Sequence, residues 1–397
     1  MSGFQESLRA LSFDEHYRCW ENDFSVSGPA MEKIHWIWDA TQFEKQVDFC
    51  GFSKINREQI LSTYQTLSQS ADFKRFVAYI CYGLAAKDKE SPGGKISFPQ
   101  LPNEPGFDHG ILYVVSLVAL VPEMRKIHRV RDIPEAVTRD TLRDIDLWMD
   151  DWRAKNGGFG FSKVKWIAGH LRGQRFALGR LQYEPSKFHR PFWILRHQGT
   201  GQLQAIALGD LGCDGAGWPL MEGGEWTTFF HEDSKGIEAH PLHAATGQIL
   251  RECGFWSHAD WEVMIRPQDP VLVMHIPASG KLDRERVDAS LIQAEDFFPK
   301  YFSEISVKAM TCSSWLMDPQ LASLLPKDSN LVQFQNRFLP LPYRNATDDQ
   351  TIERVFGKRC ENPHDYPQTT TLQRIVAQHI IHGGQWRVSS GIRLFKK

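Results

Sequence analysis

A histidine and a cysteine lie near the ends of two apolar runs in the second half of the chain. The run PVLVMH ends at His275, and the run VKAMTCSSWL contains Cys312. An imidazole titrates near neutral pH, so His275 is a candidate general base. A thiol beside such a base can act as a nucleophile. The structural alternatives are a strand-end histidine bonded to backbone and a small buried thiol.

Glu184 is a second candidate base. It ends the segment GQRFALGRLQYE, whose β-type alternation predicts a strand. Side chains on a strand alternate between its faces, so Arg180, Gln182 and Glu184 share one face. An amphipathic strand with no function would show the same polar face.

Five more polar side chains are candidate substrate contacts. Ser313 and Ser314 follow Cys312 directly, and their hydroxyls could donate to a developing oxyanion. Asn330 and Gln333 fall in SNLVQFQNRFLPLP, which we interpret as a long strand over residues 329–342. His240 could line the same cleft, and Asp318 could orient the base.

Two H-x-x-H pairs are the only spacing that favours a metal. They are His240 with His243, and His379 with His382. Two ligands do not complete a metal site, and no second pair of cysteines or acidic residues stands at a finger-like spacing. We therefore expect no metal.

The elements around His275 predict where these side chains meet. The pattern gives a strand over 271–276, a helix that begins after the candidate N-cap Asp283, and a strand over 307–316. A strand-helix-strand unit of this length makes a right-handed crossover between parallel strands. His275 and Cys312 should then end on the same edge of the sheet, beside the amino end of the helix, where backbone N–H groups can bind phosphate or carbonyl oxygen.

The rest of the chain divides into a helical part and a β-rich part. Helical spacing predominates up to about residue 171, and the stretch from Ile111 is apolar nearly all round, which predicts a buried helix. Strands are expected from residue 173 onward, with a hairpin over 191–208. Helices are expected at 318–326, 351–356 and 371–382, and a last strand at 385–395. We predict a helical domain over 1–165 and a sheet domain over 166–397.

Composition excludes several classes of partner. The 46 Lys and Arg residues balance 48 Asp and Glu residues, which gives no electrostatic reason to expect nucleic acid or an anionic membrane. Seven widely spaced cysteines without a CxxC pair predict free thiols. The amino-terminal stretch is too polar for a secretory signal, so we expect a cytoplasmic protein.

Several ordered phrases carry a resemblance to a known family. They are GRLQYEP, EAHPL, VMHIPASGKLDRERVDASLIQAEDFF, CSSWLMDPQLASLLPKDSNLVQFQNRF and TTTLQRIVAQHIIHGGQW. Over residues 40–395 the chain resembles bacterial acyltransferase-domain proteins with a helical N-terminal N-acyltransferase domain and a GNAT-like C-terminal domain. The resemblance implies an α+β or α/β fold, with a GNAT-like mixed β-sheet flanked by helices.

The resemblance also implies a donor site. GNAT enzymes bind the CoA pyrophosphate on a glycine-rich turn between a strand and the following helix. The equivalent turn here is PASGKLD, and the implied binding residues are Ile276, Ala278, Ser279, Gly280 and Lys281. The turn keeps one glycine and a lysine but lacks the repeated glycines of the GNAT pattern. That departure leaves an acyl-carrier protein open as the donor in place of acyl-CoA.

Three functions remain open on the sequence. The leading one is an acyltransferase that moves an acyl group from a thioester to an amine by direct attack, with no permanently bound cofactor. A variant passes the acyl group through Cys312. The alternative is a GNAT-like binding module that senses CoA or an acyl ligand without turnover.

Overall fold

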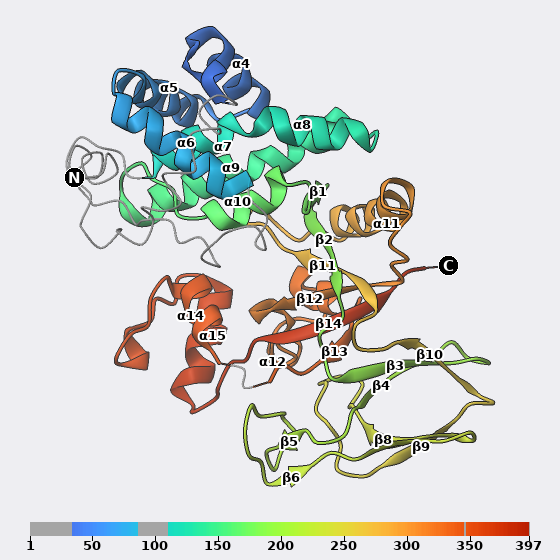
Figure 1. Ribbon diagram of the computed structural model, residues 1–397. Helices are drawn as coiled ribbons and strands as arrows, with labels where there is room; N and C mark the ends of the chain where they lie inside the picture. Colours follow the sequence, from blue (N-terminus) through green and yellow to red (C-terminus); the bar gives the residue numbers. More distant parts are fainter. Residues whose placement is uncertain (1–33, 86–109, 345–346, 397) are drawn as a thin grey trace, which may run out of the picture. The chain divides into compact units, whose positions relative to one another are not determined.

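The computed structural model describes residues 34–85, 110–344 and 347–396, and the chain forms two compact units, 1–178 and 179–397 (Figure 1). The predicted domain boundary after residue 165 falls within helix α10, Val164–Leu171. This helix contacts α7, α8 and α9 of the first unit, so the unit continues past that position.

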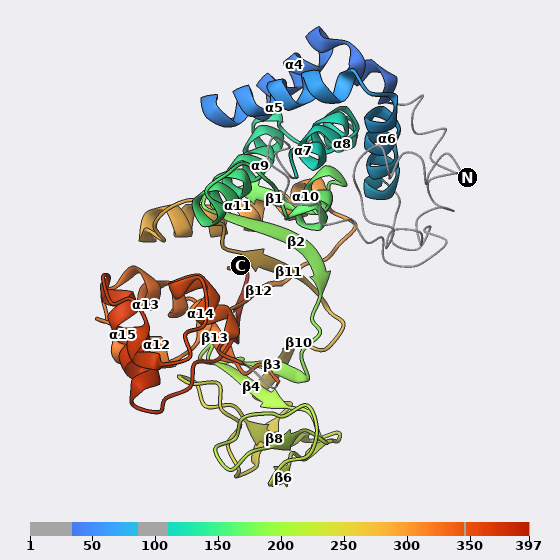
Figure 2. The same ribbon diagram turned by 90° about the vertical axis from the view of Figure 1, so that its left-hand side faces the viewer.

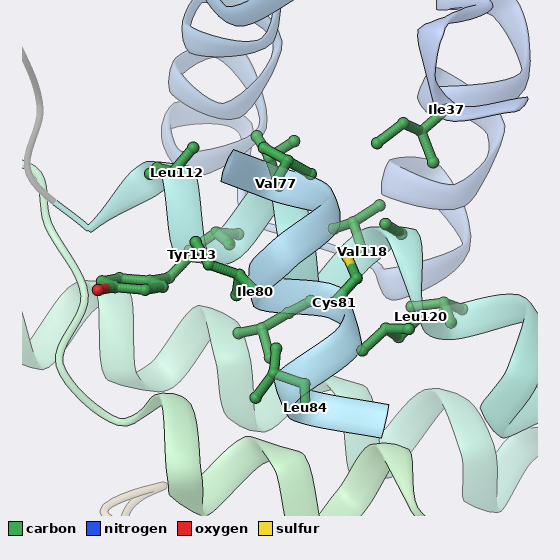
Figure 3. Packing of buried hydrophobic residues seen from close by; sticks show 14 of the residues in the cluster. Ile37, Val77, Ile80, Cys81, Leu84, Leu112, Tyr113, Val118 and Leu120 are labelled. Atoms are coloured by element: carbon green, nitrogen blue, oxygen red, sulfur yellow. The ribbon is translucent and has the colours of Figure 1, made fainter. Parts of the chain in front are cut away.

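The first unit is helical, as predicted. Its elements are η2 (His35–Trp38), α4 (Ala40–Cys50), α5 (Lys54–Ser68), α6 (Ala71–Ala85), α7 (Ile111–Ala119), α8 (Val121–Val130), α9 (Glu135–Asn156), α10 and the short strand β1 (Phe176–Leu178). Every residue of α7 is buried, which confirms the prediction of a buried helix at Ile111. Figure 3 shows Leu112, Tyr113 and Val118 of this core with Val77 and Ile80 of α6. In the described residues no helix is long and apolar enough to cross a bilayer.

The second unit contains the sheet that carries the predicted site. Its strands are β2 (Leu181–Lys187), β11 (Pro270–His275), β12 (Ala309–Ser314), β13 (Leu339–Leu341) and β14 (Ser389–Leu394). They lie in the order β2-β11-β12-β14-β13. β11 and β12 are parallel, as predicted, whereas β2 and β14 pair with them antiparallel from either side. The sheet is therefore mixed.

Helix α11 (Arg284–Tyr301) connects the two parallel strands and covers one face of the sheet (Figure 1). Ser290 of α11 is buried there, where its hydroxyl accepts from the backbone N–H of Leu181 and lies 3.0 Å from the hydroxyl of Tyr183. Side chains alternate along β2, so Gln182 and Glu184 point to the opposite face.

A second sheet is inserted between β2 and β11. It contains β3 (Phe192–His197), β4 (Leu203–Ala207), β7 (Phe230–Glu232), β8 (Gly236–Pro241), β9 (Gly254–Ser257) and β10 (Trp261–Ile265). The short strands β5 (Gly212–Cys213) and β6 (Trp226–Thr227) pair with each other. Figure 2 shows β3, β4, β8 and β10 of the inserted sheet together with β6. β3 and β4 form the predicted hairpin. An apolar cluster with members such as Phe192 and Ile265 joins the insert to Val271, Ala309 and Ile392 of the first sheet.

The segment after β12 is more helical than predicted. It contains η3 (Trp315–Met317), α12 (Gln320–Leu324) and α13 (Asn330–Gln335) before β13, and then α14 (Asp349–Phe356), η4 (Pro363–Asp365) and α15 (Thr371–Ile381) before β14. The long strand predicted over 329–342 is wrong. Ser329 caps a helix, because its hydroxyl accepts from the backbone N–H of Val332, and only Leu339–Leu341 is extended.

Candidate active site

The parallel pairing of β11 and β12 ends near the carboxyl ends of both strands. The last paired residues of β11 and β12 are Met274 and Cys312. β11 ends one residue later at His275, whereas β12 continues through Ser313 and Ser314, which pair with β14. The parallel ladder therefore ends at Met274 and Cys312, and beyond it each strand stays paired with its antiparallel neighbour, β2 or β14. We call this end of the parallel ladder the split. Such a split can take an extended ligand that carries its own amide groups.

His275 lies at this split and forms a pair with Glu184. The Nε2 atom of His275 is 3.2 Å from Oε1 of Glu184, and the side chains are 24% and 25% exposed. The antiparallel register places Gln182 opposite His275 and Glu184 opposite Val273. The side chains of these four residues therefore lie on the face of the sheet away from α11, whereas those of Leu272 and Met274 lie on the α11 face. A carboxylate only accepts hydrogen bonds, so the Nε2–H of His275 donates to Glu184.

Ser313 lies on the same face as His275. Its hydroxyl is 2.7 Å from that of Ser390 on β14 and accepts from Nη2 of Arg190 at 2.9 Å. The Arg190 guanidinium also lies over the ring of Tyr343, 4.2 Å from its centroid. These contacts fix the Ser313 hydroxyl at the end of β12 and bring a positive charge to the same region.

The loop after His275 is organised by a buried arginine. Arg180 is 3% exposed, and its guanidinium donates to the carbonyl oxygens of Pro277, Gly280 and Lys281 at 2.7–3.0 Å. Burial lowers the pKa of Arg180 from its ordinary value. The loop carbonyls thus point toward Arg180, and Gly280 takes the positive φ of 99° that the turn requires.

The amino end of α11 follows this loop with no side-chain cap. Asp283 occupies the predicted N-cap position, but its carboxylate makes no capping hydrogen bond and instead lies 3.8 Å from Arg286. Lys281, Arg284 and Arg286 are exposed at this end of the helix, which also carries the carboxylates of Asp283 and Glu285. A helix amino end with basic neighbours is suited to bind phosphate groups.

Comparisons with known proteins agree with this architecture. The model of the GNAT-like C-terminal domain matches residues 176–393, and that of the N-acyltransferase N-terminal domain matches residues 44–173. The chain belongs to the GNAT-like acyltransferase family. These matches confirm the predicted family, the predicted fold class and the predicted enzyme class, an N-acyltransferase. No protein of curated function matches the chain.

Solved structures of acyltransferases have the same fold as this GNAT-like protein. One in complex with decanoyl-CoA and teicoplanin is 19% identical with a TM-score of 0.65, and one in complex with decanoyl-CoA is 21% identical with a TM-score of 0.64. A third, a mutant in complex with octanoyl-CoA, is 20% identical with a TM-score of 0.63. In each case the similarity covers 99% of both chains.

The position of Cys312 in this acyltransferase does not favour a covalent relay. Its side chain is 1% exposed, and burial raises the pKa of the thiol to about 12. Cys312 pairs with Met274, so it projects from the α11 face, whereas the next residue, His275, projects from the other face. A histidine on the opposite face cannot take the thiol proton, and a protonated thiol is a poor nucleophile.

Two other residues of the β12 region have structural roles. The hydroxyl of Ser314 accepts from the backbone N–H of Leu316 and caps η3. Asp318 is 1% exposed and accepts from the backbone N–H groups of Gln320 and Arg387. Asp318 therefore joins α12 to the segment before β14.

The remaining predicted contacts lie outside the split. Asn330 and Gln333 are on α13 rather than on a strand, and the Gln333 amide donates to the carbonyl of Lys327. His240 is on β8 in the inserted sheet, where its ring is 3.0 Å from the carbonyl of Leu250 and packs on Trp226. These contacts place His240 in the insert rather than beside His275.

Sequence reasoning did not assign a role to three residues of the acyltransferase site. Arg180 and Gln182 were visible as polar positions on the Glu184 strand face, but their burial was not. The Oε1 atom of Gln182 is buried and has no hydrogen-bond partner among the described residues, so it is an available acceptor opposite His275. Arg190 gave no signal, because only the fold brings it to Ser313.

Proposed function

We propose that the second unit transfers an acyl group from the sulfur of an acyl-CoA to an amine. The observation that carries this proposal is the split of β11 and β12 after Met274 and Cys312, with the His275–Glu184 pair at the point where the parallel ladder ends. A thioester bound there has its carbonyl beside the base. The solved relatives that bind octanoyl-CoA or decanoyl-CoA support a donor of this class.

The donor binds along three elements in this proposal. Its pyrophosphate meets the uncapped N–H groups of α11 and the side chains of Lys281 and Arg286. Its pantetheine amides pair with backbone groups at the ends of β11 and β12, and the buried Oε1 of Gln182 accepts from one N–H group. In this proposal the loop over residues 276–281 binds the donor, and the hydrogen bonds of Arg180 hold the loop in its conformation.

The reaction proceeds by direct attack. The amine nitrogen forms a bond to the thioester carbonyl carbon while its proton passes to Nδ1 of His275. Glu184 orients the imidazole and stabilises the positive charge that it gains. The C–S bond then breaks, and the released thiolate takes a proton to become CoA-SH. Ser313, supported by Arg190, is a polar contact for the acceptor or for the carbonyl oxygen.

The test is release of free CoA together with acylation of an amine. Purified protein is incubated with octanoyl-CoA or decanoyl-CoA and a panel of primary amines, free thiol is followed with a chromogenic disulfide, and products are identified by mass. We expect thiol release that depends on the amine, and a fall of about 10²-fold or more in H275Q, because general bases contribute that much. H258Q is the matched control, since His258 also lies near a glutamate, Glu232, at 3.7 Å in the inserted sheet.

Binding without thiol release would replace the enzyme with the sensor. Release that is unchanged in H275Q would remove His275 from the mechanism. A covalent acyl adduct on Cys312 would restore the relay.

A further inference from the structure

A positively charged cavity lies between α11 and α13, on the face of the sheet that α11 covers. Its volume is about 280 Å³, and its polar lining consists of Arg284, Asp288, Gln333, Asn336, Arg337, Arg393 and Lys396. Residues 284, 288, 291 and 292 form one side of α11, and Arg393 extends from β14. The cavity is therefore bounded by two helices and by a strand of the sheet.

Cations outnumber carboxylates around this cavity. Four lining side chains are basic, and Asp288 is the acidic one. Asp288 accepts from Nε of Arg337 at 2.6 Å and lies 3.8 Å from Nε of Arg284. Glu295, just outside the lining, lies 3.4 Å from Arg393. Two carboxylates against four cations leave an excess of two positive charges.

The existing contacts hold the cations in place for an anion. Arg337 also donates to the carbonyl of Gln333, so its guanidinium is fixed against α13. The buried Nε–H of Arg393 has no hydrogen-bond partner in the part of the chain that the structure describes. Fixed guanidinium groups with spare N–H donors bind phosphate oxygens in two-point geometry.

The cavity continues the donor site. Arg284 is the first residue of α11, directly after the loop that we assign to the pyrophosphate, and Asp288 is about one helical turn further, roughly 6 Å along the axis. A volume of about 280 Å³ is at the lower end for ligand pockets, so it fits one group of a larger ligand. In CoA, a ribose 3′-phosphate lies next to the pyrophosphate.

We propose that this cavity binds the 3′-phosphate on the ribose of CoA. The inference rests on the proposed function and names its donor as a CoA thioester rather than an acyl-carrier protein. A carrier protein presents its phosphopantetheine on a single phosphodiester and has no second phosphate to fill the cavity. The dianionic 3′-phosphate balances the two excess positive charges.

The test compares CoA with 3′-dephospho-CoA, which differs only in that phosphate. In calorimetry on the full chain, the dissociation constant of CoA should be at least about tenfold lower than that of 3′-dephospho-CoA, because one charge-assisted hydrogen bond corresponds to that factor or more. In the double variant R284M/K396M the preference should fall to about threefold or less. Both wild-type side chains lie at the cavity, and Arg284 is 75% exposed, so its removal leaves the core intact.

The matched control is R286M. Arg286 is 57% exposed in the first turn of α11 but does not line the cavity, so its removal should weaken CoA and dephospho-CoA equally. Equal affinity of the wild type for both compounds, or a preference that survives in R284M/K396M, overturns the inference. Turnover of acyl-CoA with equal affinities would leave the proposed function standing without this site. Failure to bind either compound would remove both proposals.

Discussion

The substitution E184Q tests two roles of Glu184 separately: it keeps the hydrogen bond that orients His275 and removes the charge that stabilises the imidazolium. Glutamine keeps an oxygen that can accept from Nε2–H, but it loses the negative charge 3.2 Å away. Opposite unit charges at that distance attract by ~1.3 kcal/mol in water and by ~5 kcal/mol at an effective dielectric constant of 20. Both side chains are about a quarter exposed, so the value lies between these limits. A loss of ~2.5 kcal/mol in the transition state slows the reaction about 70-fold.

The assay is steady-state release of CoA with a saturating amine. We expect kcat to fall by that factor while KM for the acyl donor stays within about twofold, because Glu184 is on β2 and the proposed pyrophosphate site is formed by the loop over 276–281 and the amino end of α11. E232Q in the inserted sheet is the control, since it removes a glutamate near His258 far along the chain from the split. A kcat for E184Q within threefold of wild type, with intact folding, would refute the paired role of Glu184 and His275.

Three further predictions concern other parts of the molecule. C312A should retain activity within about tenfold, and iodoacetamide at neutral pH should not label Cys312 in the folded protein, because the pKa of its thiol is about 12; peptide mass spectrometry checks both the site and the extent. R180K should weaken CoA binding about tenfold or more in calorimetry, since one ammonium group cannot satisfy the three loop carbonyls that the guanidinium contacts; unchanged affinity would mean that the loop does not bind the donor. Burial lowers the pKa of His128 in the first unit from 6.5 to about 4, so its neutral form stabilises the fold above about pH 6.5 and this contribution is lost as pH falls toward 4. The amide of H128N can still form a hydrogen bond with Thr138. Between pH 6.5 and 4.5 the free energy of unfolding, measured by denaturant titration, should therefore fall by about 2 to 3 kcal/mol less in H128N than in the wild type. An equal fall in the two proteins would contradict the role of His128.

Local patterns predicted the strand-helix-strand unit because each of its signals is short in range. One signal is the apolar run before His275, and another is the helical spacing from Val287 to Phe298; each lies within a single segment. The preferred handedness of a strand-helix-strand crossover then predicts parallel strands. The same reasoning placed Cys312 near His275 along the edge. Cys312 is paired with Met274, however, and side chains alternate between the faces of a sheet, so Cys312 and His275 lie on opposite faces.

Other features depended on contacts that no single segment encodes. The sequence VQFQ alternates like a strand, yet the Ser329 cap and packing of Phe334 in the core make it a helix. Arg180 and the loop at 277–281 are about one hundred residues apart, and Arg337 contacts Asp288 across a gap of 49 residues. The assembly of such basic side chains around one ligand follows from the fold and not from their spacing.

The inserted sheet has its two ends side by side. The N–H of Phe188 donates to the carbonyl of Asp269, and the N–H of Gln268 donates back to Phe188. Residues 188–269 thus form an insertion that begins and ends at adjacent positions, after β2 and before β11. Its sequence can therefore vary without disturbing the first sheet, provided that apolar side chains such as Phe192 still pack with Val271 and Ala309.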